Sequence, residues 1–247
     1  MIHYKTDDQL RSIRKAGRIV AACHREIAAR IKPGVTTLEI NRFVDAYMRR
    51  CGARPAQIGY KGYPFATCAS VCDAVCHGFP TATPLMAGQV VTIDMVAELD
   101  GWMADSAWTY AVGKVSPEAQ RLMKATKQAL FRGIAQAVEG KRLGDIGYAV
   151  QQIADREGYS VVEEFIGHGI GRRMHEDPQV LHRGKPGTGK WLRKGMVITI
   201  EPIFVMGGPL VSIDNDGWTA RTIDGSWSAQ YEHTVAVMDG EPVILTR

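Results

Sequence analysis

Apolar residues recur every three or four positions through the first fifty residues, a spacing typical of amphipathic helices. Thr6 opens a capping-box pattern that starts the first helix, and Pro33-Gly34 stops it. A second helix is expected to begin at Thr36 or Thr37 and to run to Arg50. The N-terminal segment is therefore predicted to form two helices.

The pattern changes from Tyr60 to Val112, where β-branched runs punctuated by glycine and proline predict strands. Ser116 followed by Pro117 is typical of the start of a helix. We expect two helices there, broken near residues 140 to 144, and mostly strand and loop after Gly158. The order helix, helix, sheet thus occurs twice along the chain.

Short segments of the two halves also match one another. Residues 88–94 (GQVVTID) align with residues 195–201 (GMVITIE), and each segment ends a predicted strand in a carboxylate. Segments this short can match by chance, but their agreement with the order of elements favours an internal duplication. We expect one domain, 1–247, made of α+β halves at about 6–113 and 116–247. Their sheets would pack together and place the strand-borne acids in a shared cleft.

The composition of the 247 residues is that of an ordinary globular protein, with 45% hydrophobic and 23% charged residues. No apolar run approaches the roughly 20 residues of a membrane span, and the N-terminus lacks the apolar core of a signal peptide. We therefore expect a cytoplasmic protein without membrane contact. The net charge of +4 comes without a long Lys/Arg block, so sequence-specific nucleic-acid binding is not expected.

Three of the five cysteines, Cys68, Cys72 and Cys76, are evenly spaced. The spacing suggests a metal cluster at first, but it matches neither a zinc knuckle nor a ferredoxin. We interpret these residues as small buried thiols.

Two aspartates are predicted to share one face of a hairpin. Asp100-Gly101 between strand-like runs is typical of a two-residue turn. Such a turn places Asp94 opposite Ala107, and Asp105 opposite Val96. Asp94 and Asp105 are then diagonal neighbours about 7–8 Å apart at the backbone. Because acids are unfavourable in the middle of a strand, two of them on one face suggest a shared cation.

Three further polar residues lie in a similar context. Glu201 closes an apolar run just before Pro202, Glu232 is flanked by strand-like sequence, and His168 stands between glycines. Any one of these residues would ordinarily be a salt-bridged acid or a structural histidine. Five such residues that recur with the duplication favour a functional site.

Electrostatics favours metal binding by these residues. Two carboxylates about 4 Å apart repel by roughly 4 kcal/mol at an effective dielectric near 20, so four in one cleft need compensation to stay ionised. Two divalent cations would cancel the four charges. Oxygen ligands with one imidazole suit Mn²⁺, Fe²⁺, Co²⁺ or Zn²⁺ without choosing among them. Water bridging two such ions becomes a nucleophile near neutral pH, so the set predicts metal-assisted hydrolysis.

With these residues in view, the chain resembles the methionine aminopeptidases from Thr6 to the C-terminal strand. Six ordered blocks carry the resemblance: Cys76-His-Gly, Thr92-Ile-Asp, Gly167-His-Gly-Ile-Gly-Arg, His175-Glu-Asp-Pro, Thr199-Ile-Glu-Pro and Gln230-Tyr-Glu-His. The resemblance implies the pita-bread fold, a pseudo-twofold α/β metallopeptidase with a central dinuclear cleft. The chain has no N-terminal Cys/His extension and no helical insertion, so it is similar to the short bacterial type I form.

The resemblance also implies roles for the metal site. Asp94 would chelate one ion and His168 would bind the other. Asp105 and Glu232 would bridge the two ions, and Glu201 would both ligate and take the proton from the attacking water. The two histidines outside the ligand set, His77 and His175, would contact the substrate backbone and stabilise the tetrahedral intermediate.

A pocket for the methionine side chain is implied in the same way, and its residues are Tyr60, Tyr63, Cys68, Met174 and Trp218. Aromatic and sulfur groups suit a thioether because they are polarizable. Met174 stands where a phenylalanine is frequent in the family, and Gln57 where a cysteine is frequent. Both substitutions bear on the shape of the pocket.

Several other polar residues are expected to lie outside the site. Cys72 replaces an asparagine common near a monovalent-ion loop, so that ion is not predicted. His233 should point away from the site because it alternates with Glu232 along its strand. The remaining histidines, His3, His24 and His182, are expected to be surface or structural residues.

The implied activity is removal of the initiator methionine from nascent proteins whose second residue is small. Two divalent ions (Co, Mn, Fe or Zn) would be the cofactors, and a monomer with transient ribosome contact is expected. One alternative is an Xaa-Pro aminopeptidase or dipeptidase of the same fold, although these usually carry an additional N-terminal domain. The other is a non-catalytic peptide-binding relative that has lost its metals. The presence of all five ligand residues argues against the second.

Overall fold

Three of the four helices begin at the residues that the sequence predicts. In the computed structural model, which describes residues 1–247, Thr6, Thr36 and Ser116 accept backbone N–H groups at three helix starts, and Gly158 ends the fourth helix in the left-handed conformation. The helices are α1 (Asp7–Ala28), α2 (Thr37–Arg50), α3 (Pro117–Ile134) and α4 (Leu143–Glu157), with a short 3₁₀ turn at Tyr60–Gly62.

Two helix ends come earlier than expected. α1 ends at Ala28, short of Pro33-Gly34, and α3 ends at Ile134 rather than near residue 140. After α3 the backbone N–H groups of Glu139 and Gly140 donate to the carbonyls of Met238 and Leu192. These tertiary hydrogen bonds replace the helical ones, which periodicity alone cannot reveal.

The largest strand pair is the predicted hairpin of β4 (Val90–Leu99) and β5 (Trp102–Ala111). Asp100 and Gly101 form its turn, both with positive φ (51° and 75°), which glycine and aspartate tolerate best. The predicted register is confirmed, with Asp94 opposite Ala107 and Val96 opposite Asp105. β1 (Arg54–Pro55) and β2 (Cys68–Val71) pair with β4 to complete a four-stranded antiparallel sheet.

A five-stranded sheet occupies the second half, in the order β15-β14-β9-β7-β8. Its strands are β7 (Gly167–Gly169), β8 (Glu176–Val180), β9 (Val197–Ile200), β14 (His233–Ala236) and β15 (Val243–Ile244). Two three-stranded sheets, β13-β10-β6 and β11-β12-β3, complete the fold. Their strands are β3 (Ala74–Cys76), β6 (Ser160–Val161), β10 (Ile203–Val205), β11 (Val211–Ile213), β12 (Ala220–Thr222) and β13 (Ser228–Gln230).

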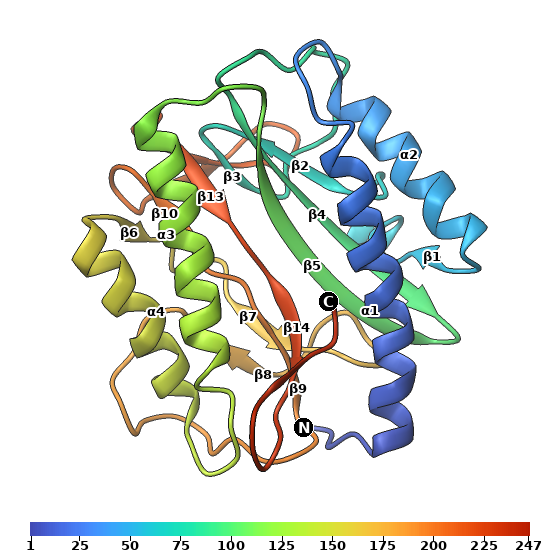
Figure 1. Cartoon of the computed structure of the whole chain (residues 1–247), viewed down its shortest axis with the longest axis vertical. Coiled ribbons are helices and arrows are strands. Elements are labelled where there is room, and N and C mark those ends of the chain that lie inside the picture. Colours follow the sequence, from blue (N-terminus) through green and yellow to red (C-terminus); the bar gives the residue numbers. More distant parts are fainter.

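The helices enclose the strands from two sides. In Figure 1, α1 and α2 lie on one side, α3 and α4 lie on the other, and β4, β5, β13 and β14 run between the two pairs. A backbone bridge between Trp108 and Tyr231 joins the two halves. The mixed helices and antiparallel sheets confirm the predicted fold class.

Each helix pair has its own apolar core. α1 and α2 pack Val20, Ile27, Val44 and Met48 against the face of β4 that carries Ile93. Full burial of one such side chain stabilises the fold by about 1.5–3 kcal/mol. The second pair has an equivalent cluster from α3, α4, β6, β10 and β13, with Phe204 completely buried. No helix combines the length and the apolar composition that crossing a bilayer requires.

The matched sequence segments adopt matched conformations. Gly88 and Gly195 both have positive φ, 94° and 86°, and β4 and β9 each begin two residues later. The resulting positions of Asp94 and Glu201 are therefore equivalent in the two halves. The division into halves at 6–113 and 116–247 stays a prediction.

Candidate metal centre

The five predicted ligand residues come from the central strands of both halves. Asp94 lies in β4, Asp105 in β5 and His168 in β7. Glu201 follows directly after β9, and Glu232 lies between β13 and β14. The chain thus brings together residues that are up to 138 positions apart in sequence.

Three of these residues form the tightest group. One ligand atom from each of Asp105, His168 and Glu232 lies within 4.8 Å of the others, and all three side chains are buried. Glu201 joins the group through its Oε1, 3.6 Å from Nε2 of His168, and Oδ2 of Asp105 is 3.9 Å from the same nitrogen. Asp94 is the diagonal neighbour of Asp105 across the hairpin.

Glycines explain why His168 can approach the acids. A Cβ on Gly169 would collide with the carbonyl oxygen of Asp177, and one on Gly167 would collide with that of Thr199. β7 therefore fits closely between β8 and β9 only because these residues lack side chains. The glycines on either side of His168 are thus required by the close packing of the strands.

Hydrogen bonds fix the orientation of the His168 ring. Its Nδ1 lies 2.9 Å from the carbonyl oxygen of Gly169, and a carbonyl can only accept, so Nδ1 carries the proton. Nε2 is then unprotonated, and its lone pair is free to bind a cation beside the carboxylates. Burial lowers the pKa of His168 to about 3, so the ring is neutral at physiological pH. A neutral imidazole held in one tautomer is suited to bind a metal.

Three of the four carboxylates have one oxygen without a hydrogen-bond donor. Oδ1 of Asp94, Oδ1 of Asp105 and Oε1 of Glu232 are all buried without any partner. A buried carboxylate oxygen without a donor is strongly destabilising unless a cation compensates it. Two of these carboxylates, Asp105 and Glu232, converge with the His168 imidazole, and this donor set fits divalent metal ions.

The pKa values of the acids lead to the same conclusion. Burial raises the pKa of Asp94 to about 6 and that of Glu201 to about 8. It raises the pKa values of Asp105 and Glu232 well above their usual range, and repulsion among the acids adds to the effect. Without cations Glu201, Asp105 and Glu232 hold protons at neutral pH, so bound metal ions would restore their ionised form.

Two residues outside the predicted set position Glu201. The hydroxyl of Thr199 donates to its carboxylate at 2.7 Å and accepts the backbone N–H of His168 at 2.9 Å. His182 accepts the backbone N–H of Glu201 through Nε2 at 3.0 Å. His182 was expected to be a surface or structural histidine, and its burial shows that it is structural. The Thr199-Ile-Glu201 block gave a signal for Thr199, but nothing local indicated the contact with His182.

The two non-ligand histidines lie beside the acids. The ring of His175 is centred 4.2 Å from that of His168, and its Nδ1 lies 2.7 Å from the hydroxyl of Tyr60. His77 packs edge-on against Phe165. Both histidines line a cavity of about 190 Å³ together with Asp94, His168 and Glu201. Burial lowers the pKa of His77 to about 4 and also lowers that of His175, so both rings are neutral at physiological pH.

The predicted methionine-pocket residues fall into two contacting groups. Tyr63 meets Trp218 edge-on at 5.0 Å between centroids, and Trp218 also faces His77 at 6.1 Å. Tyr60 packs in the apolar cluster of the buried Met174. Cys68 lies on β2 directly opposite Asp94.

Gln57, which was expected to affect the shape of the pocket, also contacts a predicted metal ligand. Its side-chain Nε2 lies 3.4 Å from both the Cys68 sulfur and Oδ2 of Asp94. Its Oε1 is buried without a partner. The residue therefore links the predicted pocket to a predicted metal ligand.

The remaining cysteines and histidines lie as expected. Cys68, Cys72 and Cys76 are buried free thiols. His233 points away from the acids and bonds through Nδ1 to the hydroxyl of Thr246 at 2.8 Å. His24 is buried and bonds to Tyr110, whereas His3 is exposed.

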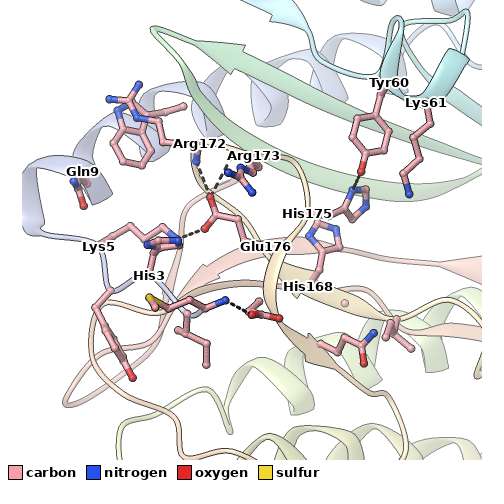
Figure 2. A pocket seen from close by; sticks show the side chains of 18 residues that line it. His3, Lys5, Gln9, Tyr60, Lys61, His168, Arg172, Arg173, His175 and Glu176 are labelled. Carbon is pink, nitrogen blue, oxygen red and sulfur yellow. Dashed lines mark hydrogen bonds and ion pairs between the residues drawn. The ribbon is translucent and has the colours of Figure 1, made fainter.

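A wider cleft of about 1080 Å³ opens beside the site. Figure 2 shows His168 and His175 on one side of it and the N-terminal segment with His3 and Lys5 on the other. Lys5 and Glu176 form a buried ion pair at 2.6 Å, and Glu176 also accepts the backbone N–H groups of Arg172 and Arg173. His168 and His175 line both this cleft and the smaller cavity at the acids, so the two spaces adjoin.

Comparison with known proteins gives consistent results. Residues 11–239 match the family described as metallopeptidase family M24. "Methionine aminopeptidase 1" of Bacillus subtilis is 41% identical over 247 residues and covers both chains fully. The crystal structure of methionine aminopeptidase from Rickettsia prowazekii superposes with a TM-score of 0.98 at 40% identity, again with full coverage of both chains.

A prolidase structure from Pyrococcus furiosus is a more distant match. Its TM-score is 0.81 at 23% identity, and the match covers 99% of this chain but 65% of that one. This similarity shows a shared fold.

Proposed function

The chain belongs to the methionine aminopeptidases of metallopeptidase family M24, and on that premise we propose that it removes the N-terminal methionine from nascent proteins whose second residue is small. The observation that carries the proposal is the group of converging ligand atoms from Asp105, His168 and Glu232, with Glu201 beside His168 and Asp94 lining the same cavity, and with buried carboxylate oxygens that lack donors.

Those five residues are the proposed ligands of two divalent cations, of which cobalt, manganese, iron and zinc all suit the donor set. When bound, such ions supply Lewis acidity and lower the pKa of a water molecule held between them. Asp94 and His168 would each hold one ion, and Asp105 and Glu232 would bridge the pair. The Gln57 amide near Asp94 would help to fix that carboxylate in place.

Glu201 is the proposed general base. Its raised pKa of about 8 gives it proton affinity near neutral pH, the range in which a base is most effective. The Thr199 hydroxyl holds its carboxylate at 2.7 Å, so the orientation of the base is fixed before substrate binds. Glu201 would take a proton from the attacking water and pass it to the departing amine.

His77 and His175 are the proposed stabilisers of the developing oxyanion. With the Tyr60 hydroxyl donating to Nδ1 of His175, the neutral ring carries its proton on Nε2. That N–H is then available to the substrate carbonyl. A donor that is oriented in advance gives the largest advantage where charge develops in the transition state.

Selection of methionine would involve Tyr60, Tyr63, Cys68, Met174 and Trp218. Edge-to-face contact between Tyr63 and Trp218 leaves little freedom in that wall, and sulfur-aromatic contacts favour a thioether. The cavity beside His77 and His175 measures about 190 Å³. This limited space supports a preference for a small second residue.

The Xaa-Pro peptidase alternative has weaker support. The prolidase match is at 23% identity and extends over 65% of that longer chain, whereas the methionine aminopeptidases match from end to end. We further propose that the protein is a cytoplasmic monomer that meets nascent chains at the ribosome. Its charge of +4 supports an electrostatic contribution to that encounter, which added salt should weaken.

A peptide panel tests the proposed activity. Met-Gly, Met-Ala, Met-Leu and an Xaa-Pro peptide are incubated with the protein and Mn²⁺ or Co²⁺, with and without chelator. We expect methionine release from Met-Gly and Met-Ala, little from Met-Leu, and none after chelation. Preference for the Xaa-Pro peptide, or release that survives chelation, would overturn the proposal.

A further inference from the structure

The rim of the cleft carries more positive than negative charge. Five cationic groups line it: the N-terminal amine, Lys5, Lys61, Arg172 and Arg173. Only two carboxylates, Glu176 and Asp177, line it as well, and both already have partners. Glu176 pairs with Lys5 and Asp177 pairs with the N-terminal amine. Three cations therefore face the cleft without an acid to neutralise them.

Lys61 is the unpaired cation closest to the proposed chemistry. It follows Tyr60, whose hydroxyl bonds to His175, and Figure 2 shows both side chains extending from one loop toward that histidine. Its ammonium lies 5.5 Å from the Tyr60 ring centroid and makes no ion pair. Its charge lowers the pKa values of both His77 and His175, so its field reaches the site.

The backbone at Lys61 has an uncommon conformation. The residue has a positive φ of 48°, the left-handed region, between Gly59 and Gly62, which also have positive φ. Arg172 is differently placed. Arg172 stacks on Trp102 at 4.1 Å and donates to the carbonyls of Asp100 and Gly101 at 3.2 Å, at the outer end of the cleft.

We propose that Lys61 makes the enzyme favour peptides that carry an acidic side chain just beyond the small second residue. The inference rests on the proposed function, in which a peptide held at the site by its N-terminal methionine would extend into this cleft, because His168 and His175 line both the cleft and the cavity at the acids. Its third residue would pass the rim formed by Tyr60, Lys61 and His175. A glutamate there would meet an unneutralised ammonium, and a lysine there would be repelled.

The strength of the preference follows from exposure. Lys61 is exposed, so solvent and salt screen its interaction with a passing carboxylate. Ion pairs of this kind change an equilibrium by only a few-fold. We expect about a threefold preference for glutamate over glutamine at the third position at low ionic strength.

The test uses three amidated peptides that differ only at the third position: Met-Ala-Glu-Ala, Met-Ala-Gln-Ala and Met-Ala-Lys-Ala. Amidation removes the terminal carboxylate, so any preference belongs to the side chain. The value of kcat/KM is measured for the wild type, Lys61→Met and Lys61→Glu at low and high salt. Lys124→Met is the matched control, because Lys124 is an exposed lysine of α3 outside the cleft.

A second readout does not depend on turnover. Binding of the Glu and Gln peptides to chelator-treated protein is measured by calorimetry for the wild type and Lys61→Met. The buried acids influence both proteins equally. The ratio of Glu-peptide to Gln-peptide affinity in the wild type, divided by the same ratio in Lys61→Met, therefore isolates the contribution of Lys61.

We expect the glutamate preference to vanish in Lys61→Met and at high salt, to reverse in favour of the lysine peptide in Lys61→Glu, and to persist in Lys124→Met. Equal rates for the Glu and Gln peptides in the wild type, or a preference unchanged by Lys61→Met, would overturn the inference. If no peptide releases methionine, the proposed function fails, and the calorimetric ratio still decides the role of Lys61.

Discussion

The segments around Asp94 and Glu201 are equivalent in sequence and backbone but differ in their surroundings. Each begins with a glycine of positive φ and carries a threonine two residues before the acid. β4 continues past Asp94 and remains paired with β5 on one side and with β1 and β2 on the other. β9 ends at Ile200, and Pro202 follows Glu201. One acid is therefore held within a sheet and the other stands at a strand end.

The two threonines show what this difference means. The hydroxyl of Thr92 forms a 2.8 Å hydrogen bond with the hydroxyl of Thr109 across the hairpin, and this bond stabilises the sheet. Thr199, at the equivalent position, donates to the carboxylate of Glu201. The two matched segments carry acids at equivalent positions, and the neighbours of these acids differ. With a pKa of about 8 against about 6, Glu201 holds its proton more strongly than Asp94, which agrees with their proposed roles as base and ligand.

The largest effect should come from exchanging the two acids for amides. We expect Glu201→Gln to lower kcat by about 10²–10⁴-fold even at saturating metal, because the base is lost. Asp94→Asn should chiefly weaken metal binding, since an amide oxygen is a poorer ligand than a carboxylate. Steady-state kinetics combined with calorimetric metal titration separates the two. Wild-type turnover in Glu201→Gln would show that the proton goes elsewhere.

His175→Ala should come next, with kcat lowered by about 10²–10³-fold and metal binding retained. Metal binding should survive because the His175 ring packs against the His168 ring but is not part of the group of converging ligand atoms. Tyr60→Phe keeps the ring of Tyr60 and removes only its hydrogen bond to Nδ1, so its loss of activity should be smaller. If His175→Ala also abolished metal binding, its assignment outside the ligand set would be wrong.

The stability of metal-free protein should fall as pH rises. The folded state raises the pKa values of Asp94 and Glu201 to about 6 and 8, so it holds protons that the unfolded chain has released. The contribution of these groups to the free energy of unfolding is greatest below about pH 4. It is lost as the pH rises through the pKa values of the folded state. Buried histidines with lowered pKa act oppositely below about pH 6.5, so the useful window lies above it.

The measurement is thermal unfolding of chelator-treated protein between pH 6.5 and 8.5. We expect Tm to drop by several degrees across this window, less in Glu201→Gln, and not at all with Mn²⁺ present. A Tm of chelated protein that rises with pH would contradict the burial of these acids.

The smallest effect should come from the pair of equivalent threonines. Thr199→Val removes the donor to Glu201, and loss of such a supporting hydrogen bond typically costs 10–100-fold in activity or metal affinity. Thr92→Val should leave kcat unchanged and lower the free energy of unfolding by about 1 kcal/mol. Kinetics and urea unfolding on both variants test the contrast. Equal kinetic losses would mean that the two halves do not differ as described.

Much of this arrangement could be predicted from local sequence. The Asp100-Gly101 turn determined the register of β4 and β5, and that register put Asp94 and Asp105 on one face. Caps at Thr6 and Ser116 set two helix starts because capping depends on residues three positions apart. Features with a local cause were thus predicted well.

What could not be predicted depends on contacts between distant segments. The early end of α3 results from hydrogen bonds to Leu192 and Met238, about fifty and one hundred residues away. The support that His182 gives to Glu201 and the contact of Gln57 with Asp94 also require the folded chain. Lys61 was an unremarkable lysine in sequence, and only its place on the rim distinguishes it.

The central claim is that residues of both halves jointly hold two divalent ions. The most direct test is metal titration of chelator-treated protein, with bound Mn²⁺ or Co²⁺ counted per chain while methionine release from Met-Ala is followed. We predict two ions per chain, fewer in Asp94→Asn, and activity that rises with metal occupancy. A protein that binds no divalent metal, or that releases methionine equally well without it, would contradict the account.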